Sequence, residues 1–237
     1  MQSGHDCIHC NNNLCIHKVP IFFGLDHDNL LKIVPLIKHE NYAKDDRLLT
    51  EGDPIDSVVI LNQGSVKAFK YTPDGREQIL YVFSEGDFFG EQFLLSSQTA
   101  TYSVEALEPV KTCMLSKADF NKLLYSYPEI SVKIIAELSG RIARMENAFQ
   151  SMGIRNVDAR IAGLLLEYSE RHKHPDSDLI HLPLSREGMA NYLGITRETM
   201  SRKLSQLEND GIIVSVNNKT IKIKERQALI LLAGKTE

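Results

Sequence analysis

The sequence lacks the features of a membrane or secreted protein. No apolar run approaches the roughly 20 residues that a transmembrane helix requires, and the polar start MQSGHDC has no signal-peptide pattern. Tryptophan is absent, and the 43% hydrophobic and 24% charged residues are typical of a soluble globular chain. We therefore expect a cytoplasmic protein that has no membrane partner.

Motifs of the common enzyme classes are also missing. The chain has no nucleophile elbow, no phosphate-binding loop and no metal-hydrolase spacing, and its eight histidines are scattered or terminal. We therefore predict that the protein is not an enzyme.

A strong positive charge is absent too. The formal net charge is –4; residues 1–152 carry 14 Lys and Arg against 20 Asp and Glu, whereas residues 153–237 carry 13 against 11. Binding to nucleic acid would therefore have to use cations clustered on one face rather than an overall basic charge.

What the chain does contain is a helix–turn–helix pattern in residues 184–211. Ser185 and Thr196 are of the types that cap helix starts, and Gly194 suits the left-handed backbone of a tight turn. Apolar residues at helical spacing give each helix a buried stripe, formed by Met189 and Leu193 and by Met200, Leu204 and Leu207. The pattern predicts two short helices joined at Gly194.

The outward face of the second predicted helix carries Arg197, Glu198, Ser201 and Arg202. Guanidinium groups bind guanine acceptors, a carboxylate accepts from cytosine, and a hydroxyl bonds either. A helix–turn–helix places the start of its second helix in the major groove, so the pattern predicts base reading; a solvated helix face is the plain alternative. Lys203 stands where the motif usually has an apolar residue, so we expect Leu204 to be buried and Lys203 to face phosphate.

The N-terminal part reads as a β-rich domain. Residues 20–40 predict one or two short helices with apolar positions that include Ile37, and residues 42–115 predict short strands separated by turns, with a hairpin around Thr72–Gly75. Regularly spaced short strands with Gly turns indicate a small barrel or double-sheet roll, within an α+β chain.

A long helix is predicted for residues 129–152. Its apolar residues recur at steps of four and three: Ile134, Leu138, Ile142, Met145, Phe149 and Met152. This stripe either packs on the β-roll of its own chain or pairs with a second copy across a two-fold axis. The length, the single seam and the charged flanks favour a homodimer.

Residues 156–171 predict a further helix and residues 180–184 a short strand. Strands at 212–216 and 220–224 would pair around 217–219 as a β wing, whose Lys219, Lys222 and Lys224 either contact DNA phosphate or only keep the wing soluble. The predicted organisation is a cysteine-bearing segment (1–18), a β-roll (19–128), a dimerisation helix (129–152) and a winged helix–turn–helix domain (153–237).

This order of parts resembles the CRP/FNR family of bacterial transcription regulators over nearly the whole chain. The resemblance rests on the EGD and GDFFGE turns, the long helix and the segment LPLSREGMANYLGITRETMSR. It implies a cyclic-nucleotide-binding-like sensor domain, a homodimer on a two-fold-symmetric operator with half-sites about one helical turn apart, and RNA polymerase as a partner. Two alternative functions from other classes are an enzyme and a thiol- or metal-binding protein with no role on DNA.

In the cyclic-AMP-binding branch of the family an Arg-Ser pair follows the Gly-Glu turn and holds the phosphate. Gly90 and Glu91 are present here, but the matching region reads ATYSV over residues 100–104. A buried phosphate would lack a cation there. We therefore expect no cyclic nucleotide and interpret Glu91 as a structural carboxylate.

The four cysteines resemble the pattern of the oxygen-sensing FNR branch. Cys7, Cys10 and Cys15 are N-terminal, and Cys113 follows Ala-Leu-Glu (106–108) at the matching step. The resemblance implies that the four thiolates hold an oxygen-labile [4Fe–4S] cluster, whose loss weakens the dimer and its DNA affinity. Four residues separate Cys10 from Cys15, where that branch typically has five.

Other uses of these cysteines stay open. Some FNR-like proteins use a thiol–disulfide switch, for which Cys15 and Cys113 are the natural partners. Zinc also suits Cys and His ligands, and three histidines crowd the same segment: His5, His9 and His17. Cys113 can also be a small buried residue with no ligand role.

The second helix of the motif carries base-reading residues of both branches. Glu198, Ser201 and Arg202 match the FNR branch, whereas Arg197 matches the cyclic-AMP branch. We expect a half-site close to TTGA or TGTGA, with Arg202 on guanine and Glu198 on the opposed cytosine.

Overall fold

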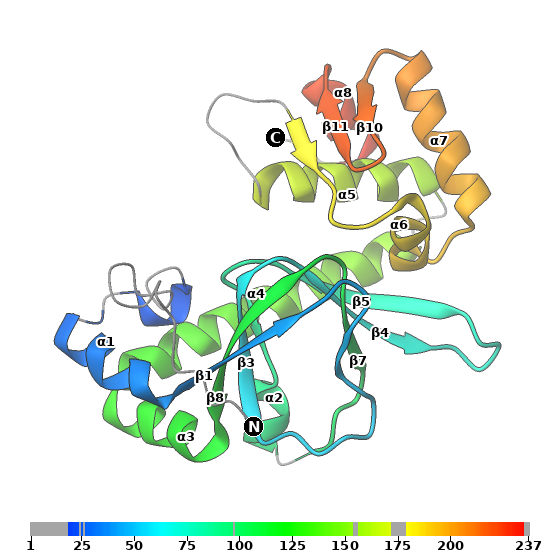
Figure 1. Cartoon of the computed structure of the whole chain (residues 1–237). Helices are drawn as coiled ribbons and strands as arrows, with labels where there is room; N and C mark the ends of the chain where they lie inside the picture. The colour runs from blue at the N-terminus through cyan, green and yellow to red at the C-terminus, as the bar shows by residue number, and fades with distance from the viewer. Residues whose placement is uncertain are drawn as a thin grey trace. The chain divides into compact units, whose positions relative to one another are not determined.

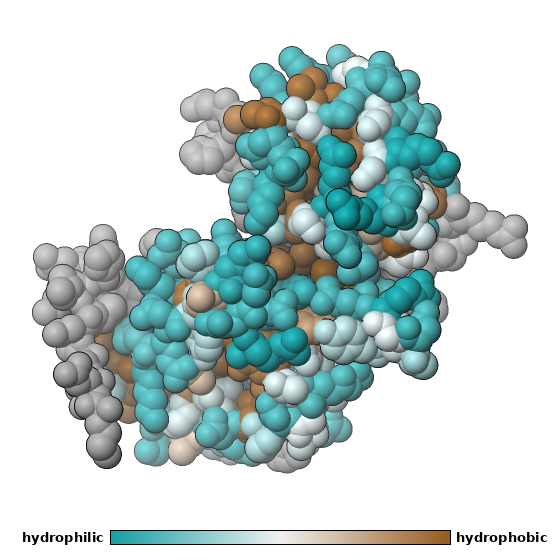
Figure 2. Space-filling model, turned by 45° about the vertical axis from the view of Figure 1, so that its right-hand side comes forward, coloured by the Kyte–Doolittle hydropathy of each residue, from teal (hydrophilic) through white to brown (hydrophobic). Residues whose placement is uncertain are grey.

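The computed structural model describes residues 19–23, 25, 27–96, 98–153, 156–171 and 179–234. Two compact units are present, one made of residues 1–70 and 80–140, the other of residues 71–79 and 141–237. Hydrophilic residues cover most of the face shown in Figure 2. In the part of the chain that the structure describes, no helix is both long and apolar enough to cross a membrane.

Two four-stranded sheets form the β-roll of the first unit (Figure 1). Their strand orders are β1-β8-β3-β6 and β2-β7-β4-β5, with antiparallel pairs. The strands are β1 (Ile37–Tyr42), β2 (Arg47–Leu49), β3 (Ser57–Gln63), β4 (Val66–Tyr71), β5 (Glu77–Phe83), β6 (Phe88–Phe89), β7 (Ser103–Ala106) and β8 (Val110–Ser116). The prediction of a double-sheet roll in an α+β chain is confirmed.

Helices flank this roll: η2 (Pro20–Phe22), α1 (His27–Ile33), η3 (Val34–Leu36), α2 (Glu91–Ser96), α3 (Lys117–Ser126) and the long α4 (Pro128–Gly153). The prediction of helix through Ile37 is wrong, because Ile37 pairs with Leu115 of β8 as the first residue of β1. Sheet pairing with a strand far along the chain overrides the local helical spacing.

Two hydrophobic clusters stabilise the first unit. One lies between helices and the sheet of β1, β3 and β8, and joins Val19, Ile21 and Phe22 to Cys113, Ile130 and Ile134. The other fills the roll with aromatic rings, where Tyr102 lies 5.2 Å from Phe93 and 5.9 Å from Tyr81, centroid to centroid. Residues 19–22 and the first turns of α4 therefore share a single core.

The apolar stripe predicted on α4 is buried at its start and exposed further along the helix. Ile134 is only 3% exposed and Leu138 is partly buried, and both pack in the core of their own chain. Ile142 and Met145 are exposed, as are Val132 and Ile135, which the sequence analysis did not assign to the stripe. The prediction of one seam from Ile134 onward is therefore wrong at its start; the side chains of Phe149 and Met152 lie outside those described.

The second unit packs helices against a small sheet. Its elements are α5 (Val157–Arg171), β9 (Leu179–His181), α6 (Arg186–Leu193), α7 (Arg197–Asn209), β10 (Ile213–Asn217), β11 (Thr220–Ile223) and α8 (Arg226–Leu232). The sheet order is β10-β11-β9. The predicted helices and wing are present; α8, with Leu229 fully buried, was not predicted.

Candidate DNA-reading surface and cysteine site

Capping side chains set the start of both helices in the helix–turn–helix. Ser185 Oγ accepts a hydrogen bond from the backbone N–H of Gly188 at 3.1 Å. Thr196 Oγ1 accepts from the N–H of Thr199 at 3.2 Å. Gly194 ends α6 in the left-handed region with φ 64°. The local signals in the sequence thus specify this turn, as predicted.

The inner faces of these helices anchor them to α5. Met189 and Leu193 of α6 are buried, as are Met200, Leu204 and Leu207 of α7. Arg160 of α5 donates from Nη1 to the carbonyl of Leu193 at 2.8 Å, which satisfies a group at the end of α6. The motif is therefore packed and hydrogen-bonded within its own unit.

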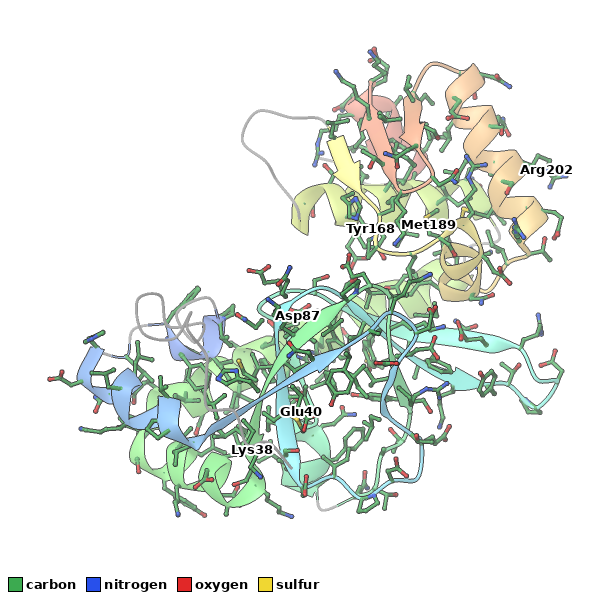
Figure 3. The ribbon with its side chains drawn as sticks, viewed as in Figure 1. Lys38, Glu40, Asp87, Tyr168, Met189 and Arg202 are labelled. Atoms are coloured by element: carbon green, nitrogen blue, oxygen red, sulfur yellow. The ribbon has the colours of Figure 1, made fainter. Side chains whose placement is uncertain are left out.

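The opposite face of α7 carries the predicted base-reading residues. Arg197, Glu198 and Arg202 are exposed and Ser201 is half-buried. Arg202 points away from the rest of its unit (Figure 3). Ser205 and Asn209 are also exposed on this face. They were not predicted, although they follow Arg202 at the helical steps of three and seven. The surface is polar and accessible along the whole helix.

Lys203, which we expected to face phosphate, is paired with a carboxylate of its own unit. Its Nζ lies 2.8 Å from Asp158 Oδ2 of α5 and 3.3 Å from Gln206 Oε1. The two charged side chains are 21% and 31% exposed. Leu204 is buried, as predicted. A carboxylate on the neighbouring helix explains how a lysine is accommodated at a position that is usually apolar.

The wing is attached directly to α7. The backbone N–H of Ser215 in β10 donates to Glu208 Oε1 at 2.9 Å. The hydrogen bond from the Ser215 side chain is the main cause that lowers the pKa of Glu208, with smaller contributions from the Ser215 backbone and the Arg186 charge. Glu208 is therefore held as a carboxylate that fixes the wing beside the helix.

Cys113 lies in the middle of β8 and is 4% exposed. It is paired across the sheet with His39 of β1, and its Sγ lies 3.5 Å from His39 Nδ1. His39 could not be singled out from the sequence, because the contact depends on the register of two strands and joins residues that are 74 positions apart. The structure thus places a thiol and an imidazole together.

Among the described residues, no group of three or more His, Cys, Asp or Glu side chains is placed to hold a metal ion. Cys7, Cys10 and Cys15 lie outside the described residues, as do His5, His9 and His17. The predicted ligand set is therefore represented in the structure by Cys113 alone.

Glu91 begins α2 and is fully buried in the roll. In the segment that would have to hold a phosphate, Ala100, Tyr102 and Val104 are buried, and Ser103 Oγ accepts from the N–H of Glu51 at 3.0 Å. None of residues 100–104 is a cation. That the roll takes no cyclic nucleotide stays a prediction.

Known proteins match both parts of this architecture. A family model of the cyclic nucleotide-binding domain matches residues 39–127, and one of the Crp-like helix-turn-helix domain matches residues 159–232. Together they cover more than half of the chain.

Among curated proteins, the nitrogen fixation regulation protein FixK of Bradyrhizobium diazoefficiens is 29% identical over 218 residues, covering 91% of this chain and 89% of FixK. The fumarate and nitrate reduction regulatory protein of Yersinia pestis is 28% identical over 237 residues, covering 99% and 94%.

The solved structure of FixK2 from Bradyrhizobium japonicum superposes with a TM-score of 0.77 at 28% identity, covering 85% of this chain and 99% of FixK2. With the domain of the β-roll and the winged helix–turn–helix domain both matched in their order, the chain belongs to the CRP/FNR family, whose members are transcription regulators rather than enzymes.

Proposed function

We propose that the protein is a transcription regulator that binds a two-fold-symmetric operator as a homodimer and responds to oxygen or redox state through its four cysteines. The observation that carries the proposal is the burial of Cys113 in the same apolar cluster as Val19, Ile21 and Phe22. That cluster ties the residues that directly follow the cysteine-bearing segment to the helix that would form the dimer. RNA polymerase is the expected partner of the DNA-bound form.

The DNA-binding part of the proposal rests on α7. Its first two turns present Arg197, Glu198 and Arg202 to solvent from a helix that Thr196 caps and that is hydrogen-bonded to α5 through Lys203. These groups match the donor and acceptor pattern of a guanine–cytosine pair in the major groove. The half-site we propose is close to TTGA or TGTGA, with Arg202 on guanine and Glu198 on cytosine.

The proposal of a homodimer is supported by apolar side chains of α4 that are exposed to solvent. Val132, Ile135 and Ile142 leave 65%, 62% and 56% of their surface exposed. Steps of three and seven place them on one side of the helix, which is the spacing of a coiled-coil seam. Exposed large aliphatic side chains in a row are typical of a surface that a partner covers, and a second α4 across a two-fold axis offers the same row in return.

The proposal of a cysteine sensor is supported by the position of Cys113 in the same apolar cluster as residues 19–22. Cys15 precedes Val19 by four residues, so the connecting chain spans at most about 14 Å. Val19 is buried in the cluster that contains Cys113. Cys15 can therefore approach Cys113, and Cys10 and Cys7 follow within a few residues.

The donor set fits an iron–sulfur cluster, because four cysteine thiolates are the ligands of a [4Fe–4S] centre. When bound, such a group supplies a centre that oxygen degrades. This chain's residues would hold it as a link between the N-terminal segment and β8. Releasing that link would leave the segment before Val19 without its attachment to the core beside α4.

Two other switches share this geometry. The same reach allows a Cys15–Cys113 disulfide, and the His39 imidazole beside Cys113 provides the mixed nitrogen and sulfur donors that zinc prefers. Protein purified without oxygen separates the three. A broad visible absorption that air bleaches indicates the cluster; a mass lower by two hydrogen atoms after oxidation in air indicates the disulfide; and stoichiometric zinc indicates the third.

Gel-shift titration of a symmetric operator with TTGA or TGTGA half-sites tests the regulator itself. Arg202→Ala and Glu198→Ala should weaken binding and relax the half-site preference. Lys122→Ala, which removes one exposed cation from α3, is the matched control and should bind as the wild type does. Unchanged affinity of both α7 variants for every duplex would overturn the proposal.

A further inference from the structure

The contact between His39 and Cys113 joins an exposed imidazole to a buried thiol. The two residues face each other across the β1–β8 pair and so project from the same face of the sheet. β1 is the edge strand of its sheet, which leaves the His39 ring at the solvent boundary while Cys113 lies beneath it. Nδ1 is the ring atom that approaches Sγ, at 3.5 Å.

The neighbours of Cys113 in the core are apolar: Ile37, Ile60 and Leu115 belong to the same cluster. A thiolate in such surroundings loses hydration, and a hydrogen-bond donor directed at the sulfur offsets part of that loss. An imidazole with its proton on Nδ1 is such a donor. Hydrogen bonds to the coordinating sulfurs also contribute to the properties of iron–sulfur clusters in general.

We propose that His39 is a positioning residue for the cluster: its Nδ1–H donates to the Cys113 thiolate and holds that sulfur at the sheet surface as a ligand. The inference rests on the proposed function, since it takes Cys113 as a cluster ligand. It assigns a role to a residue outside the cysteine pattern, and that role is separate from the zinc alternative, in which the imidazole nitrogen would itself bind the metal.

The plain alternative is that a polar side chain at this position only protects an edge strand from pairing with another chain. Lys38 and Glu40 flank His39 on β1 (Figure 3) and are exposed as it is. Because neighbours on a strand point to opposite faces, Lys38 projects away from Cys113. Lys38→Leu is therefore a matched control that changes the same edge strand without touching the thiol.

The test compares full-length wild type, His39→Leu, His39→Gln and Lys38→Leu after anaerobic loading with iron and sulfide. Iron and sulfide contents are measured first, and then the loss of visible absorption after an iron chelator is added without oxygen. Removing a group that hydrogen-bonds to a metal ligand typically costs about 10- to 100-fold, so we expect His39→Leu to lose its absorption roughly tenfold faster. His39→Gln keeps an N–H donor and should lie near wild type, as should Lys38→Leu.

The possible failures can be told apart. If the wild type takes up no iron and sulfide, the proposed cluster is wrong and this role of His39 falls with it. If the wild type loads but His39→Leu loses iron at the wild-type rate, only the role of His39 is overturned. Equal acceleration by His39→Leu and Lys38→Leu would also overturn it, because the effect would then belong to the edge strand. Thermal unfolding of each variant shows that the comparison is between folded proteins.

Discussion

Two adjacent isoleucines of α4 are predicted to respond in opposite ways to truncation. Ile134 is 3% exposed and packs in the core of its own chain, whereas Ile135 is 62% exposed. Ile134→Ala should therefore weaken the fold, and Ile135→Ala should weaken the homodimer and leave the fold intact. The pair offers the same chemical change at consecutive positions of one helix.

The size of both effects follows from burial. Full burial of an isoleucine side chain is worth about 1.5–3 kcal/mol, and 62% of Ile135 remains for a partner to cover. Since a two-fold interface contains the residue twice, the loss is about 2–4 kcal/mol per dimer, and the dimer Kd should rise roughly 20- to 500-fold. Ile134→Ala should cost about 2–5 kcal/mol in the free energy of unfolding, because it leaves a cavity.

Sedimentation equilibrium measures the Kd, and denaturant unfolding followed by circular dichroism measures the stability. Both variants must be unfolded at one protein concentration, since dimerisation adds to the stability of any folded dimer. The reasoning is refuted if Ile135→Ala dimerises as wild type does, or if Ile134→Ala weakens the dimer without destabilising the chain.

Three further predictions concern the second unit. In a double-mutant cycle, Lys203→Met and Asp158→Asn should show a coupling of about 1 kcal/mol in the free energy of unfolding, as expected for a partly exposed ion pair. Hydrogen bonds from Ser215 lower the folded-state pKa of Glu208. The stability that Glu208 contributes is therefore present above its unfolded-state pKa and is lost as the pH falls through its folded-state pKa. Glu208→Gln should reduce this loss of stability in thermal unfolding between pH 6 and pH 3, roughly the carboxyl titration range. Arg202→Ala should cost about 1–3 kcal/mol against the preferred operator and less against random DNA in competition binding.

The helix–turn–helix was predictable because its signals are local. Ser185, Gly194 and Thr196 act on backbone groups within a few residues, and their roles can be read from residue type and spacing alone. The β-roll was predictable as a class for a similar reason, since its turns are marked in the sequence. The base-reading residues follow from the same helix register and stay predictions until DNA binding is measured.

The features that the sequence did not predict depend on contacts between distant segments. Ile37 fits a helical spacing but pairs with Leu115, and His39 meets Cys113 only through the same register. On α4 both Ile134 and Ile135 have apolar residues three or four positions away. Periodicity therefore cannot predict which of the two is buried in its own chain. The pairing of Lys203 with Asp158 could not be predicted either, because the two residues lie on different helices and are 45 positions apart.

The shared core of the first unit leads to a last prediction, about coupling between cluster and dimer. Ile130 and Ile134 of α4 lie in the apolar cluster that holds Cys113 and Val19, while Val132 and Ile135 on the same turns are exposed, where we propose that a second copy packs. If holding the cluster strengthens dimerisation, thermodynamic linkage requires that dimerisation strengthens cluster binding by the same factor. At equilibrium with a competing chelator, the protein should therefore retain less iron when it is dilute, and Ile135→Ala should retain less than wild type at concentrations where the wild type is dimeric and the variant is not. Iron retention that is independent of both would show that the two sites are not coupled, even if each exists.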